Sequence, residues 1–473
     1  MTDQTAVRIG TQEVHTPDAM VITSPYDGHE VGRVPTCTPD HVETAVAAAS
    51  SAMASPLPAW QRAEILDAAA RVVAERRDEL ATIIAEEAAK PIGTARTEAE
   101  RCVLTFQTAA AVARTLTGEV VPMDAGAPGE GKLGFTLRVP RGVVAAISPF
   151  NFPLNLVAHK LAPAIAAGCS VVLKPASQTP LSALRLQALL MDECDLPPGW
   201  INVVTGSGAS VGDPLVTHRD VAVVTFTGSP SVGWSIAEKA ARKKVGLELG
   251  NNAPLIIDAS GDWETAASKV AVAGYSHAGQ SCISTQRVYV HASIAEDFTA
   301  ALGEQVRGLR IGDPLDPETD VSSLISPDDT ERVKGWIDGA VAAGAEIVAG
   351  GDRHDRLLEP TLLRGIEPDM DVSRKEVFGP VVGIATFDTL DDAFALANDT
   401  EFGLQAALFT AELDGALRAA RELDYGGVLV NEVPTFRTDQ MPYGGVRDSG
   451  NTKEGPFYAV HEMTRERLVI LSS

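Results

Sequence analysis

The sequence has few cysteines, few aromatic residues and a shortage of positive charge. Its 473 residues include 5 cysteines at scattered positions, without a Cys-x-x-Cys pair, and aromatic residues make up 5% of the chain. An odd, scattered set of cysteines predicts reduced and mostly buried thiols in a cytoplasmic protein, rather than a disulfide framework. No group of Cys, His and carboxylate residues has the spacing of a metal site, so no metal is expected.

The charge balance and the lack of long apolar runs argue against two further classes of protein. Lys and Arg number 39 and Asp and Glu 63, which gives a formal net charge of −24. A phosphate backbone would repel such a chain, so no nucleic-acid partner is expected. Residues 1–15 contain no apolar core of a secretion signal, and the longest uncharged stretch, residues 143–158, is interrupted by prolines and asparagines. We therefore expect neither a signal peptide nor a membrane span.

The chain does contain short apolar runs that alternate with helical stretches. Residues 44–113 are Ala-rich with apolar positions at helical spacing, broken at Pro91. From residue 143 onward, fully apolar runs between helical segments predict parallel sheets with both faces covered, an α/β fold. The predicted strands are Val143–Ser148, Cys169–Lys174, Ile201–Val204 and Val221–Thr225 in a first series, and Leu255–Asp258, Arg287–His291, Glu346–Ala349 and Val428–Asn431 in a second.

Two further segments read as strands that lie outside these series. Lys132–Val139 alternates apolar and polar residues, and Arg465–Leu471 is similar. Strands outside the main sheets expose backbone that another chain can pair with. They predict an arm that joins subunits into a homodimer or homotetramer.

Two features could bind a phosphate-bearing ligand. The glycine-rich stretch from Phe226 to Gly233 follows a predicted strand and opens a helix, where free N–H groups can face an anion. Its spacing is not the usual Gly-x-Gly-x-x-Gly, so an ordinary strand–helix turn explains it equally well. Lys174 ends a predicted strand, and in parallel sheets ligands lie beyond that end, although a surface lysine is the alternative.

Three residues could carry covalent chemistry. Cys282 lies among small polar neighbours, which suits an accessible thiol, although most single cysteines are structural. Glu248 is a carboxylate among apolar residues and could act as a general base, or simply face outward from a strand edge. Asn151 lies in a proline-flanked elbow and could donate to an oxyanion, or cap a turn. His277, five residues before the cysteine, is interpreted as an ordinary helix residue.

Taken together and in order, these motifs resemble those of the aldehyde dehydrogenase superfamily, over essentially the whole chain from about Thr23. Three segments look most like the branch of lactaldehyde, phosphonoacetaldehyde and non-phosphorylating glyceraldehyde-3-phosphate dehydrogenases. They are Leu154–Lys160, Gly279–Ser284, and Pro434–Arg437 through Met441–Gly445. The motifs are Pro149-Phe150-Asn151-Phe152-Pro153, Lys174-Pro175-Ala176, Phe226-Thr227-Gly228-Ser229, Glu248-Leu249-Gly250, Gly279-Gln280-Ser281-Cys282 and Glu376-Val377-Phe378-Gly379-Pro380.

The resemblance implies a reaction and its catalytic residues. Cys282 would attack the aldehyde, and Asn151 with the backbone N–H of Cys282 would hold the oxyanion. Hydride transfer to a nicotinamide would leave a thioester, which Glu248 would hydrolyse by activating water. The presence of Glu248 favours release of a carboxylic acid over transfer of the acyl group to coenzyme A.

The resemblance also implies a set of cofactor contacts. Lys174 would bind the adenine-side ribose, Gly228, Ser229 and Gly233 the pyrophosphate, and Glu376 and Phe378 the nicotinamide half. The full set implied is Phe150, Lys174, Ser177, Gly228, Ser229, Gly233, Leu249, Glu376 and Phe378.

Two positions depart from the family pattern. NAD-preferring relatives often carry Glu where this chain has Ser177, and a carboxylate there would repel the 2′-phosphate of NADP by roughly 4 kcal/mol at about 4 Å. Ser177 therefore predicts that NADP is accepted as well as NAD. Asn251 replaces a second glycine after Glu-Leu-Gly, and we expect it to adopt an unusual backbone angle that Asn tolerates.

The substrate is expected to be a small aldehyde with an oxygen or an anionic group, as in that branch. Arg101, His159 and Arg437 are the predicted contacts, because an Arg fork matches a carboxylate or phosphate. A helix salt bridge, a satisfied histidine and a surface charge are the alternatives. Some anion-binding relatives carry Arg where this chain has Ser281, which argues against a phosphate-sized group.

The predicted fold is thus α/β, with a Rossmann-like cofactor domain, an α/β catalytic domain and a small β oligomerisation arm. Two alternatives on this fold are a binding protein that has lost catalysis and an acyl transferase or esterase without redox chemistry. Neither would need the full set of catalytic and nicotinamide motifs. The predicted division is 1–117 and 141–248 for the cofactor domain, 249–437 for the catalytic domain, 118–140 and 453–473 for the arm, and 438–452 for a return segment.

Overall fold

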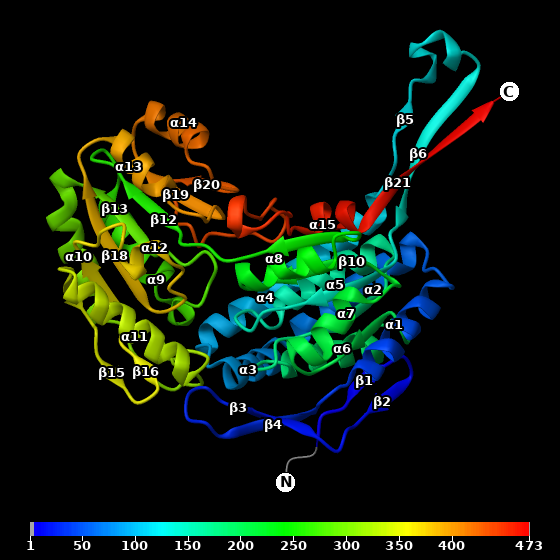
Figure 1. Cartoon of the computed structure of the whole chain (residues 1–473), viewed down its shortest axis with the longest axis horizontal. Helices are drawn as coiled ribbons and strands as arrows, with labels where there is room; N and C mark the ends of the chain where they lie inside the picture. Colours follow the sequence, from blue (N-terminus) through cyan, green and yellow to red (C-terminus); the bar gives the residue numbers. More distant parts are fainter. Residues whose placement is uncertain (1–3, 473) are drawn as a thin grey trace.

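The computed structural model of the protein describes residues 4–472, and forms two α/β lobes with a projecting β arm (Figure 1). The predicted domain ends at Met1–Asp3 and at Ser473 lie outside the described residues. Among residues 4–472, no helix combines the length and the apolar character needed to cross a bilayer. The predicted domain boundaries stay a prediction, and the sheets are described below as the chain forms them.

The first lobe is built on a five-stranded parallel sheet with strand order β11-β10-β7-β8-β9. Four of its strands were predicted to within a few residues, and β11, which ends at Glu248, was not. Their apolar side chains are buried because helices cover both faces of the sheet (Figure 1). The strands are β7 (Val143–Ile147), β8 (Val171–Lys174), β9 (Ile201–Val203), β10 (Val221–Thr227) and β11 (Lys244–Glu248).

Two groups of helices pack on this sheet. The predicted break at Pro91 is present, because Ala89 takes a left-handed backbone (φ 50°) and Pro91 starts the next helix. The helices of this lobe are α1 (Pro39–Met53), α2 (Ala59–Glu75), α3 (Arg77–Ala88), α4 (Ile92–Thr115), α5 (Asn155–Ala167), α6 (Leu181–Glu193), η3 (Gly208–Gly212), α7 (Asp213–Thr217), α8 (Pro230–Lys239) and α15 (Pro456–Met463).

Two short hairpins precede these helices and were not predicted. Their strands are short and mostly exposed, so they lack the apolar runs that marked the other strands. The strands are β1 (Val7–Ile9), β2 (Gln12–Val14), β3 (Ala19–Thr23) and β4 (Glu30–Pro35).

The second lobe holds a seven-stranded sheet with order β14-β17-β18-β13-β12-β19-β20, parallel except for the β14–β17 pair. The prediction found four of the strands and missed β17, β18 and β19. The strands are β12 (Pro254–Ile257), β13 (Arg287–His291), β14 (Glu346–Ala349), β17 (Thr361–Arg364), β18 (Val381–Phe387), β19 (Gln405–Phe409) and β20 (Gly427–Val430), beside a small hairpin of β15 (Arg353–His354) and β16 (Leu357–Leu358).

Helices cover this sheet as well and bury a second apolar core. They are α9 (Trp263–Ala273), η4 (Ser276–Gly279), η5 (Ala292–Ile294), α10 (Ala295–Arg307), α11 (Pro327–Ala342), α12 (Asp371–Arg374), α13 (Leu390–Asn398), α14 (Leu413–Glu422) and η6 (Arg447–Ser449).

The arm is a three-stranded sheet that leaves the first lobe (Figure 1). It contains β5 (Val120–Val121), β6 (Lys132–Pro140) and β21 (Thr464–Ser472), beside the short turns η1 (Met123–Ala125) and η2 (Ala127–Gly129). The two predicted arm strands pair with each other, antiparallel from Thr464↔Pro140 to Ser472↔Lys132. Leu133, Leu468 and Ile470 stay exposed on this ribbon, so the single chain leaves an apolar surface uncovered there.

The chain crosses between the lobes twice, and these crossings create the site. It first passes directly from β11 to β12. After β20 it returns through residues 431–455 to α15, where Gly450 bridges to Glu248. The return segment thus lies over the carboxyl ends of the first sheet, where ligands of parallel sheets are found.

A buried carboxylate ties α3 to the start of α6. Glu87 is fully buried and accepts hydrogen bonds from the backbone N–H of Leu181 (2.7 Å) and of Ser182 (2.9 Å). These groups belong to the first turn of α6, which has no intrahelical partners for them. Glu87 on α3 therefore supplies the hydrogen-bond acceptor for the first N–H groups of α6.

Replacing this carboxylate should destabilise the protein. We expect Glu87→Ala to lower the free energy of unfolding by about 1–3 kcal/mol, because the buried N–H groups lose their acceptor. Denaturant unfolding monitored by circular dichroism measures the change. Glu86→Ala, one position along the same helix and only half-buried, is the control and should change it by less than about 0.5 kcal/mol.

Candidate active site

Cys282 lies in a tightly built loop between the lobes. His277 and Ala278 before it take left-handed backbones (φ 50° and 53°), and Gly279 follows with φ 69°. A Cβ on Gly279 would lie 2.0 Å from the carbonyl oxygen of Gly379, so only glycine fits there. Cys282 is half-buried whereas the other four cysteines are buried, and burial raises the pKa of its thiol to about 12.

His277 lies in the short turn η4, but it is not the ordinary helix residue that the sequence predicted. Its backbone is left-handed, a region in which His, Asn and Asp are enriched among non-glycine residues. The side chain is buried and neither ring nitrogen has a hydrogen-bond partner. Burial and the charge of Lys90 hold the pKa of His277 well below its ordinary value, so the ring is a weak base, and no hydrogen bond joins it to the Cys282 thiol.

Asn151 is attached to the same loop. Its side-chain Nδ2 donates to the carbonyl oxygen of Gln280 (2.9 Å), two residues before Cys282, and the residue is buried. One N–H of the amide remains for another acceptor, as an oxyanion contact requires.

Glu248 ends β11 and faces the return segment. It is buried, and neither carboxylate oxygen has a hydrogen-bond partner. Burial, and secondly the charge of Glu454, raises its pKa well above the usual range. Gly444 allows the close approach, since a Cβ there would lie 2.6 Å from Oε1 of Glu248.

Lys160 and Glu454 lie beside Glu248, and neither was predicted as a site residue. Lys160 Nζ donates to Thr227 Oγ1 (2.7 Å) and lies 3.7 Å from Glu454 Oε1. A cavity of about 20 Å³, lined by Glu248, Glu454 and His159 among others, has room for about one water molecule. Glu454 belongs to no motif, and only the return segment brings it here.

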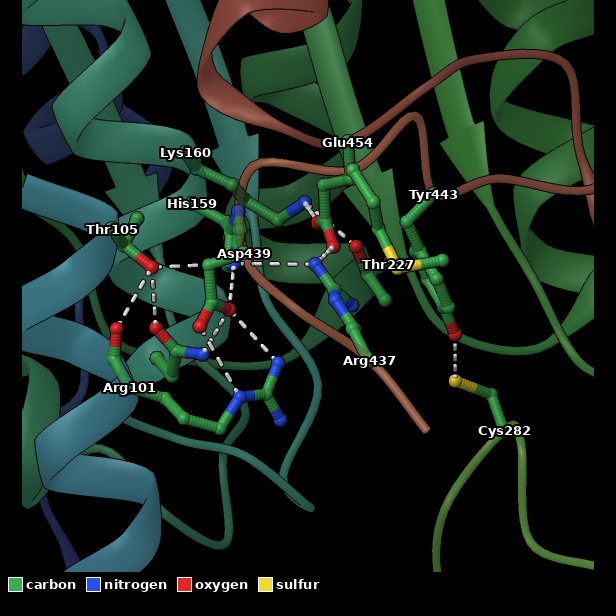
Figure 2. Close-up of polar contacts among 12 residues, drawn as sticks. Arg101, Thr105, His159, Lys160, Thr227, Cys282, Arg437, Asp439, Tyr443 and Glu454 are labelled. Atoms are coloured by element: carbon green, nitrogen blue, oxygen red, sulfur yellow. Dashed lines mark hydrogen bonds and ion pairs between the residues drawn. The ribbon is translucent and has the colours of Figure 1, made fainter. Parts of the chain in front are cut away.

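Two of the predicted substrate residues, Arg101 and His159, contact Asp439, and the third, Arg437, lies against His159 (Figure 2). Asp439 itself was not predicted. Asp439 accepts from Arg101 Nη2 (2.8 Å) and lies 2.9 Å from His159 Nε2. Burial acts to raise its pKa, but the hydrogen bonds from His159 and Arg101 hold the pKa well below its usual range. Asp439 is therefore an anion, and it already neutralises Arg101.

Arg437 is the arginine of this group with free hydrogen-bonding capacity. Its Nη2 donates to Glu454 Oε2 (2.9 Å), and its guanidinium lies 3.8 Å from the ring centroid of Tyr443. Its buried Nε has no partner. An unsatisfied buried N–H is costly, so this group is ready to bind an acceptor. The geometry thus ranks Arg437 above Arg101 as an anion contact.

Lys174, a predicted adenine-side residue, lines a cavity of about 390 Å³ between β8, α7 and α8. Lys174 is buried there, and burial lowers the pKa of its amine to about 8. Ser177 donates its hydroxyl to the carbonyl oxygen of Gly206 (3.0 Å) and adds no charge. Asp213 also lines the cavity, but Lys239 pairs with it at 2.8 Å.

The glycine-rich stretch forms a strand–helix turn with free N–H groups. Helix α8 starts after Ser229, and no side chain caps its first turn. A Cβ on Gly228 would lie 2.6 Å from the Phe226 ring, and one on Gly233 would lie 2.4 Å from a methyl of Leu249. The uncapped helix start can receive a pyrophosphate, so these residues fit a dinucleotide.

The remaining predicted cofactor residues gather between this helix and Cys282. Glu376 is half-buried, and burial raises the pKa of its carboxyl to about 7. Its Oε1 accepts from the backbone N–H of Asn251 (2.9 Å). Phe378 takes a left-handed backbone (φ 48°) and meets the edge of Phe150 with ring centroids 5.7 Å apart.

The expected unusual backbone at Asn251 is wrong. Its φ does not lie in the left-handed region, so the backbone conformation at this position does not favour glycine. Its side chain is buried and satisfied, with Nδ2 donating to the carbonyl of Gln405 (3.3 Å) and Oδ1 accepting from Leu404 N (3.4 Å).

The parallel sheets, the uncapped helix start and the lined crevice define an α/β oxidoreductase that binds a dinucleotide. Comparison with known proteins agrees, because the profile of the aldehyde dehydrogenase family matches residues 13–469. The chain is 46% identical over 457 residues to the 3-sulfolactaldehyde dehydrogenase of Priestia aryabhattai, covering 97% of this chain and 96% of that protein.

Two further relatives support the same assignment. The lactaldehyde dehydrogenase of Methanococcus maripaludis is 39% identical over 414 residues, 87% of this chain and 88% of that protein. The solved structure of the NADP-dependent glyceraldehyde-3-phosphate dehydrogenase from Bacillus halodurans C-125, complexed with NADP, has a TM-score of 0.97 at 34% identity and covers 100% of both chains.

The chain therefore belongs to the aldehyde dehydrogenase family. As a member of this family it is an NAD(P)-dependent oxidoreductase that acts on an aldehyde. The predicted family, fold class, reaction and cofactor type are confirmed, whereas the roles of individual residues stay predictions.

Proposed function

We propose that this enzyme oxidises a short 2-hydroxyaldehyde that carries a strong anion at its far end, a sulfonate above all. The observation that carries the proposal is Arg437, whose buried Nε lacks a partner while its guanidinium stacks on Tyr443, the neighbour of Cys282. The 46% identity to a 3-sulfolactaldehyde dehydrogenase supports this choice.

Cys282 is proposed as the nucleophile. Its thiolate sulfur forms a bond to the aldehyde carbon, and the carbonyl electron pair moves to oxygen. The second N–H of the Asn151 amide and the backbone N–H of Cys282 donate to that oxyanion. When bound, the nicotinamide accepts the hydride from the same carbon and leaves a thioester on Cys282.

Glu248 is proposed as the general base for hydrolysis of the thioester. As a carboxylate it takes a proton from water, whose oxygen attacks the acyl carbon, and the sulfur leaves with its electron pair. A raised pKa makes Glu248 a stronger base once it is ionised, and nearby Lys160 and Arg437 favour that ionised form.

The cofactor contacts are proposed as the sequence predicted them, with NADP accepted. Lys174 supplies a positive partner for the adenine-side ribose and Ser177 supplies no repulsion. The uncapped start of α8 takes the pyrophosphate, and Glu376 accepts from the nicotinamide ribose.

We also propose that the enzyme is a cytoplasmic homodimer or homotetramer. The five free cysteines suit a reducing compartment. Leu133, Leu137, Leu468, Ile470 and Leu471 are exposed on the arm, and covering them with a second copy would bury apolar surface.

The general-base assignment predicts a change in the time course. Glu248→Gln should release about one equivalent of reduced nicotinamide per active site in a burst and then turn over at least about 100-fold slower than wild type, because deacylation stalls. Stopped-flow absorbance of reduced nicotinamide measures both phases. Cys282→Ala is the control and should show neither phase.

An unchanged steady-state rate in Glu248→Gln would contradict this role. A steady-state rate that requires added coenzyme A and is unchanged by Glu248→Gln would indicate acyl transfer in place of hydrolysis.

The anion contact predicts a change in substrate preference. Arg437→Gln should lower kcat/KM for 3-sulfolactaldehyde relative to lactaldehyde by about 10- to 100-fold, since a charged hydrogen bond is worth about 1.5–3 kcal/mol. Because both substrates are measured with one enzyme preparation, the ratio of their kcat/KM values does not depend on the fraction of enzyme that is folded. Arg421→Gln, an exposed arginine on α14, should leave the ratio unchanged, and an equal ratio in Arg437→Gln would refute the contact.

Ser177 predicts the cofactor range. Ser177→Glu should raise KM for NADP at least about tenfold and KM for NAD by less than about threefold, because the new carboxylate repels the 2′-phosphate. Ser177→Gln has nearly the same size without the charge and serves as the control. Equal effects of Ser177→Glu on both cofactors would rule out the repulsion argument.

A further inference from the structure

Tyr443 contacts the sulfur of Cys282, and the sequence did not single it out. Within residues 4–472, its hydroxyl is the one hydrogen-bond partner of Sγ, at 2.8 Å (Figure 2). The side chain is buried and packs with Ile283 and Leu404 beside the cysteine. The contact therefore joins the return segment to the nucleophile.

We propose that Tyr443 is a catalytic hydrogen-bond donor that stabilises the thiolate of Cys282. The proposal deepens the proposed function, because it assumes only that Cys282 reacts as a thiolate. A partly desolvated thiolate needs a donor, and within residues 4–472 the Tyr443 hydroxyl is the group hydrogen-bonded to the sulfur. Asn151 donates one N–H to the carbonyl of Gln280 and Arg437 donates to Glu454, and neither is hydrogen-bonded to the sulfur.

The surroundings of the phenol suit a donor. Burial raises the pKa of Tyr443 well above its ordinary value, so the phenol keeps its proton. The guanidinium of Arg437 lies 3.8 Å from its ring centroid and stacks on the ring, which fixes the ring and makes the O–H more acidic as a donor. The same arginine is the proposed anion contact, so one stacked pair connects substrate binding to the nucleophile.

The proton balance of this step is simple. The S–H bond of Cys282 breaks, the electron pair stays on sulfur, and the proton leaves to water. Tyr443 keeps its proton and points its O–H at the sulfur, so that the hydroxyl donates to the thiolate. When the sulfur bonds to carbon it loses its charge and becomes a weak acceptor, which frees the hydroxyl.

The thiol also faces three charged groups that set its titration. Glu376 and Glu248 raise the pKa of Cys282, and Arg437 lowers it. Because none of these groups changes in a Tyr443→Phe variant, a shift in that variant reports the lost hydroxyl.

Alkylation by iodoacetamide tests the proposal without any aldehyde. Iodoacetamide reacts with the thiolate, so the rate rises with pH through the thiol pKa. Tyr443→Phe should move this inflection about one to two pH units to the alkaline side, which is about a 10- to 100-fold slower alkylation at fixed pH. Tyr458→Phe is the matched control and should behave as wild type.

The same inflection in Tyr443→Phe and wild type would overturn the proposal. A shift accompanied by weaker NADP binding or a lowered Tm would also count against it, because a structural defect would then explain the result. Since alkylation needs no substrate, the proposal can fail while the proposed aldehyde oxidation stands, and the reverse.

A second experiment changes the donor strength of the phenol without removing its hydroxyl. Replacing all 6 tyrosines with 3-fluorotyrosine makes the phenol a stronger donor at the cost of one fluorine atom per ring. The alkylation inflection should then move to the acidic side in wild type and stay unmoved in Tyr443→Phe. An equal shift in both proteins would assign the effect to another tyrosine and refute the proposal.

Discussion

The active site depends on one buried anion, the carboxylate of Asp439. It receives hydrogen bonds from Arg101 on α4 and contacts His159 on α5, and both contacts attach the return segment to the first lobe. Arg437 lies two residues before it and Tyr443 four residues after it. Holding Asp439 ionised therefore holds both of these side chains over Cys282.

Desolvation acts on every reactive group of this site, and each group is compensated by a different partner. Burial raises the pKa of Cys282 to about 12 and that of Glu376 to about 7, while it lowers the pKa of Lys174 to about 8. Such shifts are typical of functional sites. Because of these shifts, the resting thiol of Cys282 is neutral. Catalysis therefore needs hydrogen-bond donors that stabilise the negative charge once it develops on the sulfur.

Two arginines of the cluster play different parts although the sequence treats them alike. Arg101 makes a bidentate contact with Asp439, at 2.8 Å and 3.3 Å, and so serves to position the return segment. Arg437 keeps an unsatisfied Nε and is the arginine that can recognise a substrate anion. A single substitution at each position separates positioning from recognition.

The sequence by itself determined the α/β class, most of the buried strands, the break at Pro91 and the set of family motifs around Cys282, Glu248 and Asn151. These are encoded locally, in apolar runs and in short motifs. It missed β17 to β19 and the N-terminal hairpins, whose residues lack a distinctive run. It also missed Asp439, Tyr443 and Glu454, and misjudged His277 and Asn251. Only the tertiary structure decided the roles of these residues. The return segment contacts β11, α4 and α5 through residues that lie hundreds of positions apart in the chain. The burial and the pairing of the charged groups at the site depend on those contacts.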